Sequence, residues 1–300
     1  MKSTYLFFFW LATSSLYAQT GLFEKITQLR PSTEWKQTAA VQLKFPSFHP
    51  QGMLKIGEYF YMSSVEVTRK RRTPSDNGEG IGHLFKFDIN GKLIAQITLG
   101  EGTMYHPGGI DFDGKYIWVP VAEYRPNSKS IIYKVQPESM TSEVVTRFND
   151  HIGAIVHPNT SKTLSGASWG SRYFYHWSID KNGHVTDTDL SPEKIRIANP
   201  SFYIDYQDCH SLGKHLMLCG GLQRYRKPDG TSLSLGGLEV INLTDNRPVF
   251  QVPLLLWSPT GAPMTNNPFF IETTTSGLQA YFVPDDDAAS TLFAYETILK

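Results

Sequence analysis

The chain has 300 residues, with 28 Lys plus Arg and 28 Asp plus Glu, so its formal net charge is zero. A neutral chain has no strong overall field, which argues against nucleic acid or a membrane surface as its partner. With 24 Gly, 18 Pro and 13% aromatic residues, the composition is typical of many short strands joined by turns.

Residues 1–18 have the pattern of a signal peptide. Lys2 gives a positive start, and the apolar run Tyr5–Ala12 follows it. Leu16–Ala18 then ends on a small residue that suits cleavage before Gln19. The apolar run is too short to span a bilayer, and no later stretch is long enough. We therefore expect a secreted or periplasmic protein without a membrane span.

A phrase that contains histidine and glycine returns about once every fifty residues. Its copies are His49–Met53, His106–Ile110, His151–Ala154 and Asp208–Leu212, with a degenerate copy at Met264–Pro268. A period of this size built from strands predicts a β-propeller. Because the repeat runs nearly from end to end, we expect one all-β domain over residues 19–300.

The segments after each copy alternate in the manner of strands. In the second repeat, strands are expected at Gly109–Phe112, Tyr116–Ala122, Ser130–Gln136 and Ser142–Phe148. In the third, a strand is expected over Arg172–Ile179 and another near Val185, after the turn dipeptide Asn182-Gly183.

The fifth repeat ends after three strands, while Glu34–Phe45 forms an unattached strand ahead of the first copy. Pairing this N-terminal strand with the last blade closes the ring and removes two open edges. Five blades are therefore predicted. Six blades are the alternative, because the copies are unevenly spaced.

Cys209 and Cys219 flank an expected hairpin turn around Lys214. Such a turn places the two cysteines opposite each other, so a cross-strand disulfide can form in an oxidising compartment. The alternative is a pair of buried free thiols.

In a propeller, the loops that lead into the inner strands share one face with the loops between second and third strands. Here this face gathers His49, His106, His151 and His210, one from each of four blades. Imidazole is the commonest neutral metal ligand and a natural base near neutral pH. We expect these histidines to bind Zn²⁺, Mn²⁺ or Fe²⁺, completed by Gln51, Asp208 or Asn267, or to serve as structural turn residues.

Basic and aromatic residues share the same face. Arg125, Arg172 and Arg224 are candidates for binding carboxylate or sulfate. The aromatic residues beside them offer flat faces for sugar rings: Tyr124, Trp169, Tyr173 and Tyr225. The Arg69–Arg72 run is interpreted as a solvated rim. Asp285–Asp287 is a weaker candidate for Ca²⁺.

The His-Pro-Gln-Gly and His-Pro-Gly-Gly-Ile-Asp phrases resemble secreted propeller proteins such as the SMP-30/gluconolactonase and paraoxonase group. The metal shell of that group is mostly Asn, Asp and Glu, whereas this chain has histidine at these positions. The mixture of His, Arg and Tyr is more similar to propeller polysaccharide lyases and to the uronate-oligosaccharide dehydratases of ulvan degradation. The resemblance implies β-elimination on an anionic carbohydrate.

The sequence thus predicts a β-eliminase, either lyase or dehydratase, for oligosaccharides that contain uronic acid. Arg125, Arg172 and Arg224 would neutralise the carboxylate. His106, His151 or His210 would be the base or metal ligands, and Tyr225 or Tyr124 the acid. The alternatives are a metal-dependent lactonase or esterase, and a binding propeller for glycan or protein. A monomer is expected.

Overall fold

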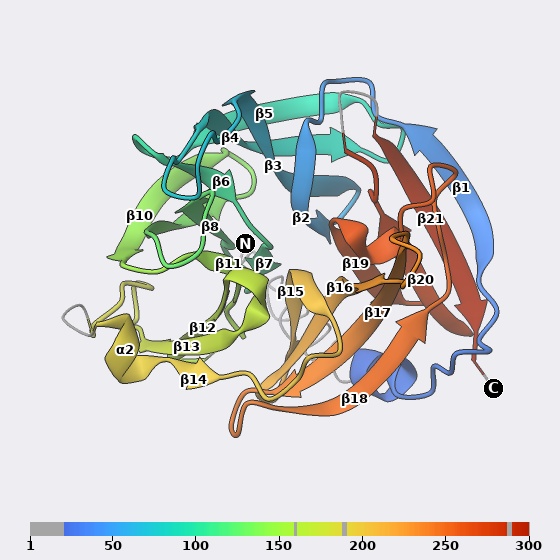
Figure 1. Ribbon diagram of the computed structural model, residues 1–300. Helices are drawn as coiled ribbons and strands as arrows, with labels where there is room; N and C mark the ends of the chain where they lie inside the picture. The colour runs from blue at the N-terminus through green and yellow to red at the C-terminus, as the bar shows by residue number, and fades with distance from the viewer. Residues whose placement is uncertain (1–20, 159–160, 188–190, 287–289, 300) are drawn as a thin grey trace, which may run out of the picture.

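The computed structural model describes residues 21–158, 161–187, 191–286 and 290–299. Within these residues the strands form five antiparallel sheets, arranged around a central axis as the blades of a propeller (Figure 1). The prediction of an all-β, five-bladed propeller is confirmed. No helix in these ranges is long and apolar enough to cross a membrane. The predicted signal peptide lies outside the described residues.

The blades follow one another in chain order. Blade 1 contains β2 (His49–Ile56), β3 (Tyr59–Arg69), β4 (Glu79–Asp88) and β5 (Leu93–Leu99). Blade 2 contains β6 (Met104–Pro107), β7 (Asp111–Phe112), β8 (Ile117–Glu123), β9 (Ser130–Gln136) and β10 (Thr141–Phe148). Blade 3 contains β11 (Ile152–Val156), β12 (Thr163–Ser168), β13 (Tyr173–Ser178) and β14 (Ile197–Ala198).

Blades 4 and 5 complete the ring. Blade 4 contains β15 (Asp205–Gly213), β16 (Leu216–Arg226), β17 (Ser232–Asn242) and β18 (Arg247–Leu254). Blade 5 contains β19 (Phe269–Thr273), β20 (Gly277–Phe282), β21 (Thr291–Ile298) and, from the other end of the chain, β1 (Lys36–Gln42). Short helical segments lie between strands: η1 (Trp169–Ser171), α2 (Pro192–Ile195) and η2 (Met264–Asn266).

The ring closes as the sequence predicted. β1 pairs antiparallel with β21, so the N-terminal strand becomes the outer strand of the last blade. The fourth strand of blade 3 differs from the prediction. Val185 makes only an isolated bridge with Ile179, and the outer strand is β14. The turn at Asn182-Gly183 returns the chain for that one bridge, and the blade is completed only after α2.

Five clusters of buried apolar side chains lie between neighbouring blades, one in each seam of the ring. Strand β8 illustrates how one strand serves two of them. Val119 and Val121 point into the seam with blade 1, and Trp118 points into the seam with blade 3. Successive side chains of a strand face opposite sides, so a central strand must be apolar on both.

The inner strands approach one another closely at the axis. A Cβ atom added to Gly109 would lie 2.8 Å from the Cα of Asp208, and one added to Gly52 would lie 2.7 Å from the Cα of Gly109. No side chain fits in that space. The glycines of the repeated phrase are therefore needed where the backbones of different blades meet.

The Asp208 side chain ties three blades together at this point. Its carboxylate accepts hydrogen bonds from the backbone N–H of Met53 at 2.8 Å and of Ile110 at 3.0 Å. It also caps the N–H of Cys209 in its own strand at 3.0 Å. Asp208 is completely buried, and His210 Nε2 lies 3.4 Å from the same carboxylate.

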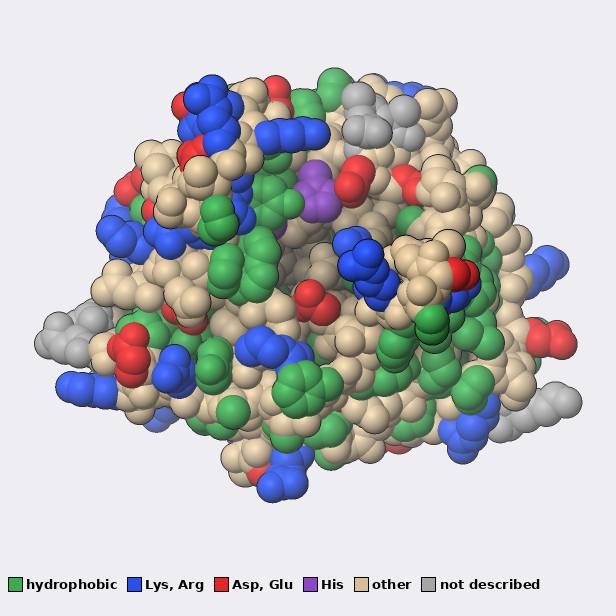
Figure 2. Space-filling view, viewed as in Figure 1, with side chains coloured by type: hydrophobic (Ala, Val, Ile, Leu, Met, Phe, Trp, Pro, Cys, Tyr) green, Lys and Arg blue, Asp and Glu red, His purple; other side chains and the backbone are tan. Residues whose placement is uncertain are grey.

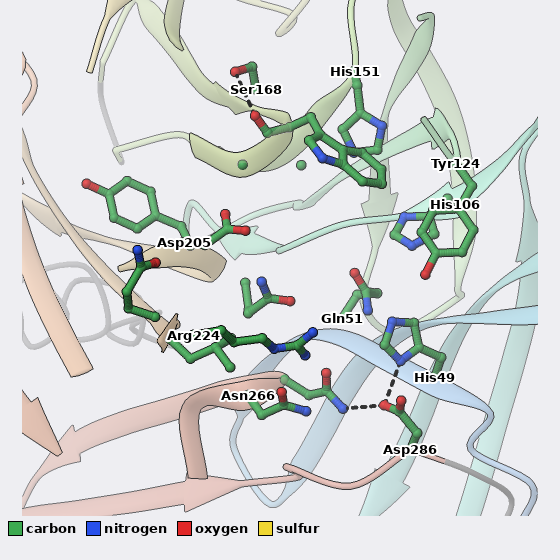
Figure 3. Close-up of a pocket in the computed structure, with 18 residues that line it drawn as sticks. His49, Gln51, His106, Tyr124, His151, Ser168, Asp205, Arg224, Asn266 and Asp286 are labelled. Atoms are coloured by element: carbon green, nitrogen blue, oxygen red, sulfur yellow. Dashed lines mark hydrogen bonds and ion pairs between the residues drawn. The ribbon is translucent and has the colours of Figure 1, made fainter. Parts of the chain in front are cut away.

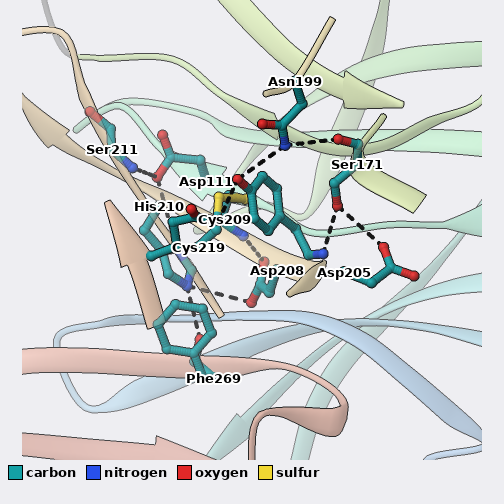
Figure 4. The surroundings of a disulfide bond; sticks show 12 residues. Asp111, Ser171, Asn199, Asp205, Asp208, Cys209, His210, Ser211, Cys219 and Phe269 are labelled. Carbon is teal, nitrogen blue, oxygen red and sulfur yellow. Dashed lines mark hydrogen bonds and ion pairs between the residues drawn. A yellow bond between two sulfur atoms is a disulfide. The ribbon is translucent and has the colours of Figure 1, made fainter. Parts of the chain in front are cut away.

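Cys209 and Cys219 are direct partners in the β15–β16 ladder and form a disulfide (Figure 4). Of the two alternatives for these cysteines, the disulfide is confirmed. Both residues are completely buried beside Asp208, in the seam between blades 3 and 4. The bond therefore reinforces the inner strand that carries the axial carboxylate.

Replacing Asp208 should destabilise the ring far more than its size suggests. Asp208→Ala leaves the N–H groups of Met53 and Ile110 buried without acceptors and removes the carboxylate that pairs with His210. We expect the free energy of unfolding to fall by about 3–5 kcal/mol in denaturant titrations with the disulfide intact. The exposed Asp245→Ala control should stay within about 0.5 kcal/mol of wild type. Equal small losses in both variants would contradict the axial role.

Candidate functional site

A cavity of about 510 Å³ opens at the centre of the face where the inner strands begin. Figure 2 shows the molecule hollowed there, with histidine at the rim. All five blades contribute to this axial pocket, and Figure 3 shows side chains pointing into it from several sides. Its lining residues are His49, Gln51, His106, Tyr124, His151, Gly153, Ser168, Trp169, Gly170, Asp205, Tyr206, Gln207, Leu222, Gln223, Arg224, Asn266, Asn267 and Asp286.

A repeated irregularity of the inner strands sets the pocket side chains. The strand register shifts by one residue near the start of β2, β11 and β15. A β-bulge of this kind bends the strand and re-aims its side chains. One titratable residue stands just ahead of each bulge: His49, His151 and Asp205. His106 has the same place in the repeated phrase of blade 2, so four blades each present one such group.

The predicted place of His210 in this set does not hold. Asp208 follows the bulge in β15 as Gly52 does in β2, so the residue equivalent to His49 is Asp205. His210 lies deeper and is buried, with Nε2 2.8 Å from the carbonyl oxygen of Phe269 (Figure 4). Burial alone would lower the pKa of His210, but the adjacent carboxylate of Asp208 raises it above its usual value. This histidine is part of the axial core.

His49 is held by a carboxylate at the rim of the pocket. Its Nδ1 lies 2.6 Å from Oδ1 of Asp286, which also accepts a 2.7 Å hydrogen bond from the Asn267 amide. Burial would raise the pKa of Asp286, but the hydrogen bond and charge of His49, together with the Asn267 hydrogen bond and the charge of Arg224, outweigh it and the pKa is lowered. Because the carboxylate can only accept, Nδ1 carries a proton, and in the neutral ring Nε2 is then the nitrogen with the free lone pair.

His106 lies in the middle of the histidine row and is stacked on Tyr124, with ring centroids 4.1 Å apart. Its ring centroid is 6.2 Å from that of His49 and 5.9 Å from that of His151. Both ring nitrogens are buried and have no hydrogen-bond partner among the described residues. Burial, reinforced by His151 and His49, lowers the pKa of His106 well below its usual value, so the ring is neutral.

His151 is anchored through the backbone of blade 2. Its Nδ1 donates to the carbonyl oxygen of Glu123 at 2.8 Å, which leaves Nε2 unprotonated. Burial lowers the pKa of His151 to about 4. The Glu123 carboxylate is itself buried and accepts hydrogen bonds from Thr103 at 2.6 Å and Arg125 at 2.6 Å.

The long loop between β3 and β4 braces this part of the wall. Arg71 donates to the carbonyl oxygen of Tyr124 at 2.8 Å, and Asn77 accepts from Arg125 at 2.6 Å. Arg69 pairs with Asp76 at 2.8 Å. Part of the basic run interpreted as a solvated rim therefore fixes the position of Tyr124.

Asp205 faces the histidine row from the other side of the pocket (Figure 3). Burial raises its pKa above the usual value, although a hydrogen bond from Ser171 and the charges of Arg172 and Arg224 oppose this. Arg224 makes no hydrogen bond or ion pair with the part of the chain that the structure describes, and it lines the cavity. Its guanidinium is therefore available to a ligand.

Aromatic and amide side chains complete the wall. The rings of Tyr124 and Trp169 lie 5.9 Å apart at a tilt of 45°. Five amides also line the pocket, namely Gln51, Gln207, Gln223, Asn266 and Asn267. Aromatic ring faces suit the apolar parts of a ligand, and the many neutral donors and acceptors beside them suit its hydroxyl groups.

Of the predicted site residues, eight line the axial pocket: His49, Gln51, His106, Tyr124, His151, Trp169, Arg224 and Asn267. The others lie outside it because they are engaged elsewhere. Arg125 pairs with Glu123 at 2.6 Å, and the Arg172 guanidinium stacks on Phe202 at 4.4 Å.

The two remaining predicted residues also point away from the cavity. Tyr173 lies under Arg196, 4.9 Å from the guanidinium. Tyr225 follows Arg224 on β16, so its side chain faces the opposite side of the sheet and is 49% exposed. Sequence reasoning missed Asp205 and Gln207 as pocket residues. The signal for Asp205 is its position three residues before Asp208, which corresponds to the position of His49 before Gly52. The repeats were compared by their histidines, and this comparison selected His210 instead.

Over the described ranges, no three His, Cys, Asp or Glu side chains form a group that could hold a metal ion. His49 and His151 instead form hydrogen bonds, His49 with Asp286 and His151 with the carbonyl oxygen of Glu123. Metal binding by the histidine row stays a prediction. For the Ca²⁺ candidate, Asp285 accepts a hydrogen bond from Ser258 at 3.0 Å, and Asp287 lies outside the described residues.

Comparisons with known proteins bear on the family and the fold. A family model described as "Family of unknown function (DUF6454)" matches residues 9–300. No curated protein matches the sequence. The tail fibre of Staphylococcus aureus phage P68 is similar in structure, with a TM-score of 0.51 and 12% identity over 93% of this chain and 56% of that one. This similarity concerns the fold alone.

Two further structures are similar at lower scores. An α-L-arabinanase of Penicillium chrysogenum has a TM-score of 0.48 and 8% identity, covering 86% of this chain and 98% of that one. The hydrazine synthase of Kuenenia stuttgartiensis has a TM-score of 0.38 and 11% identity, covering 82% of this chain and 58% of that one. The chain thus spans little more than half the length of the tail fibre and the synthase.

The lowered pKa of His151 makes stability depend on pH in a defined direction. Below pH 6.5 the unfolded chain binds a proton at this residue, while the folded state does not until about pH 4. The contribution of His151 to the free energy of unfolding is therefore fully present above pH 6.5 and is lost as the pH falls towards 4. When the pH is lowered from 7 to 4.5, we expect the free energy of unfolding of His151→Gln to fall by about 2 kcal/mol less than that of wild type in denaturant titrations. Parallel curves for the two proteins would contradict a buried neutral His151.

Proposed function

This chain belongs to the family of unknown function DUF6454, and we propose that it is a carbohydrate-active β-eliminase for oligosaccharides that contain uronic acid. One observation carries the proposal. A single pocket holds a ring nitrogen free to take a proton, a carboxyl group of raised pKa and an unpaired guanidinium. These are the base, the acid and the cation that elimination beside a carboxylate needs.

The pocket wall supports an oligosaccharide as the ligand. Trp169 and Tyr124 offer apolar faces to sugar rings, and the five amides offer donors and acceptors to hydroxyl groups. Arg224 is the guanidinium that would bind the uronate carboxylate. A secreted or periplasmic location is part of the proposal. The buried disulfide supports it, because such bonds persist in oxidising compartments.

His49 is the best-placed base. Asp286 fixes its tautomer and orientation, and Asn267 fixes Asp286 in turn. His49 Nε2 would take the proton from C5 of the uronate ring, and the electron pair left behind forms the C4–C5 double bond. Arg224 neutralises the carboxylate while negative charge develops on it. His106 is less suited because both its ring nitrogens are buried.

Asp205 is the matching acid. The departing oxygen on C4 leaves with the bonding pair and needs a proton, which the protonated Asp205 carboxyl would supply. Its raised pKa favours the protonated form closer to neutral pH. Depending on whether that oxygen belongs to a sugar or to a hydroxyl group, the reaction is that of a lyase or of a dehydratase.

Glycoside hydrolysis is the second candidate, because two carboxylates of the same pocket have pKa values shifted in opposite directions. Burial raises the pKa of Asp205, whereas at Asp286 burial is outweighed by His49, Asn267 and Arg224 together, so that pKa is lowered. A protonated acid and an ionised base are the pair that glycosidases use. The products distinguish the two reactions, since hydrolysis leaves no double bond.

The test is ultraviolet absorbance while the purified protein acts on a panel of oligouronates and ulvan fragments, with product masses measured afterwards. Elimination produces a conjugated double bond and rising absorbance. We expect Asp205→Asn and His49→Gln each to lower kcat by roughly a hundredfold or more, with Asp245→Asn unchanged. Turnover without absorbance would favour hydrolysis or a lactonase. Binding without any turnover would leave a binding propeller and end the eliminase proposal.

A further inference from the structure

Phe202 is an exposed aromatic residue beside the axial pocket. It lies between β14 and β15, on the segment that leads into Asp205. At 73% exposure it is the most exposed large apolar side chain in the described ranges. Its position is not that of a lone surface residue, because one face of the ring is occupied.

Arg172 links this ring to the wall of the pocket. Its guanidinium carbon lies 4.4 Å from the centroid of the Phe202 ring. Its Nε donates to the carbonyl oxygen of Gly170 at 2.6 Å, and Gly170 lines the pocket. A cation against one face of an aromatic ring fixes the ring and leaves the other face open.

Arg172 also lies close enough to the proposed acid for its charge to act on it. The Arg172 charge acts on Asp205, and Ser171, next to Arg172 in the chain, donates to the Asp205 carboxylate at 3.2 Å. Arg172 Nη1 is buried with no hydrogen-bond partner in the described part of the chain. A buried donor of this kind is usually satisfied by ordered water or by a ligand.

We propose that Phe202 and Arg172 form an outer sugar subsite, which binds the next ring of the oligosaccharide beyond the pocket on the leaving-group side. This inference rests on the proposed function. The open face of Phe202 packs against the C–H groups of a sugar ring, as aromatic platforms do. The side is set by Asp205, because the group that receives its proton departs towards the surface next to it. The subsite thus determines how kcat/KM depends on the chain length of the substrate, and it leaves the chemistry at the linkage unchanged.

The test compares wild type with Phe202→Ala on oligouronates of two, three and four rings. For the disaccharide we expect the same kcat/KM in both proteins. For the longer substrates we expect a loss of roughly five- to twentyfold in the variant, mostly through KM. Phe202→Trp should restore kcat/KM for the longer substrates. Tyr59→Ala is the matched control, since Tyr59 also lies under a cation, Lys86 at 4.7 Å, at the opposite end of blade 1.

Loss of activity that is equal for all lengths, or no loss for any, would overturn the subsite while leaving the proposed function intact. Failure of the wild type to convert any oligouronate would instead overturn the proposed function. In that case the dissociation constants of the same oligouronates, measured by Trp fluorescence, decide whether the subsite exists. Weaker binding of only the longer chains by Phe202→Ala supports it, and length-independent binding rejects it.

Discussion

The buried carboxylate of Asp208 is the interaction on which the rest of this ring depends. It accepts backbone hydrogen bonds from the inner strands of blades 1 and 2 and caps its own strand in blade 4. Backbone groups this deep have no access to water, so each needs a protein acceptor. The glycines around the axis allow the approach. Because the inner strands are fixed here, the axial pocket lies between the ends of these strands that carry the register shifts.

The pocket inherits its chemistry from this geometry. Burial favours the neutral form of every titratable group, so it lowers the pKa values of His106 and His151 and raises that of Asp205. Only where a partner compensates does a charged form persist, as with Asp286 beside His49. The site therefore combines neutral imidazoles, a carboxyl group of raised pKa and the Arg224 guanidinium, which has no ion-pair partner among the described residues. Such a set can move a proton between two positions on a ligand without a large net charge.

The fold was predictable because its signals are local and repeated. The phrase containing His49, His106 and His151 marks the start of an inner strand, and the alternation in β8 marks a strand buried on both faces. The site was only partly predictable. Asp205 replaces histidine in blade 4, and only strand register reveals the equivalence. Whether Arg125 and Arg172 are free depends on their contacts with Glu123 and Phe202, and only the folded structure shows that these contacts form.

The most direct measurement is the crystal structure of the Asp205→Asn protein soaked with an oligouronate, since slowed turnover preserves the bound substrate. The account predicts electron density for sugar rings in the axial pocket. A uronate carboxylate should lie on the Arg224 guanidinium, C5 should face His49 Nε2, and the linkage oxygen should lie beside residue 205. Sugar bound with its carboxylate away from Arg224, or an empty pocket at saturating ligand, would contradict the account.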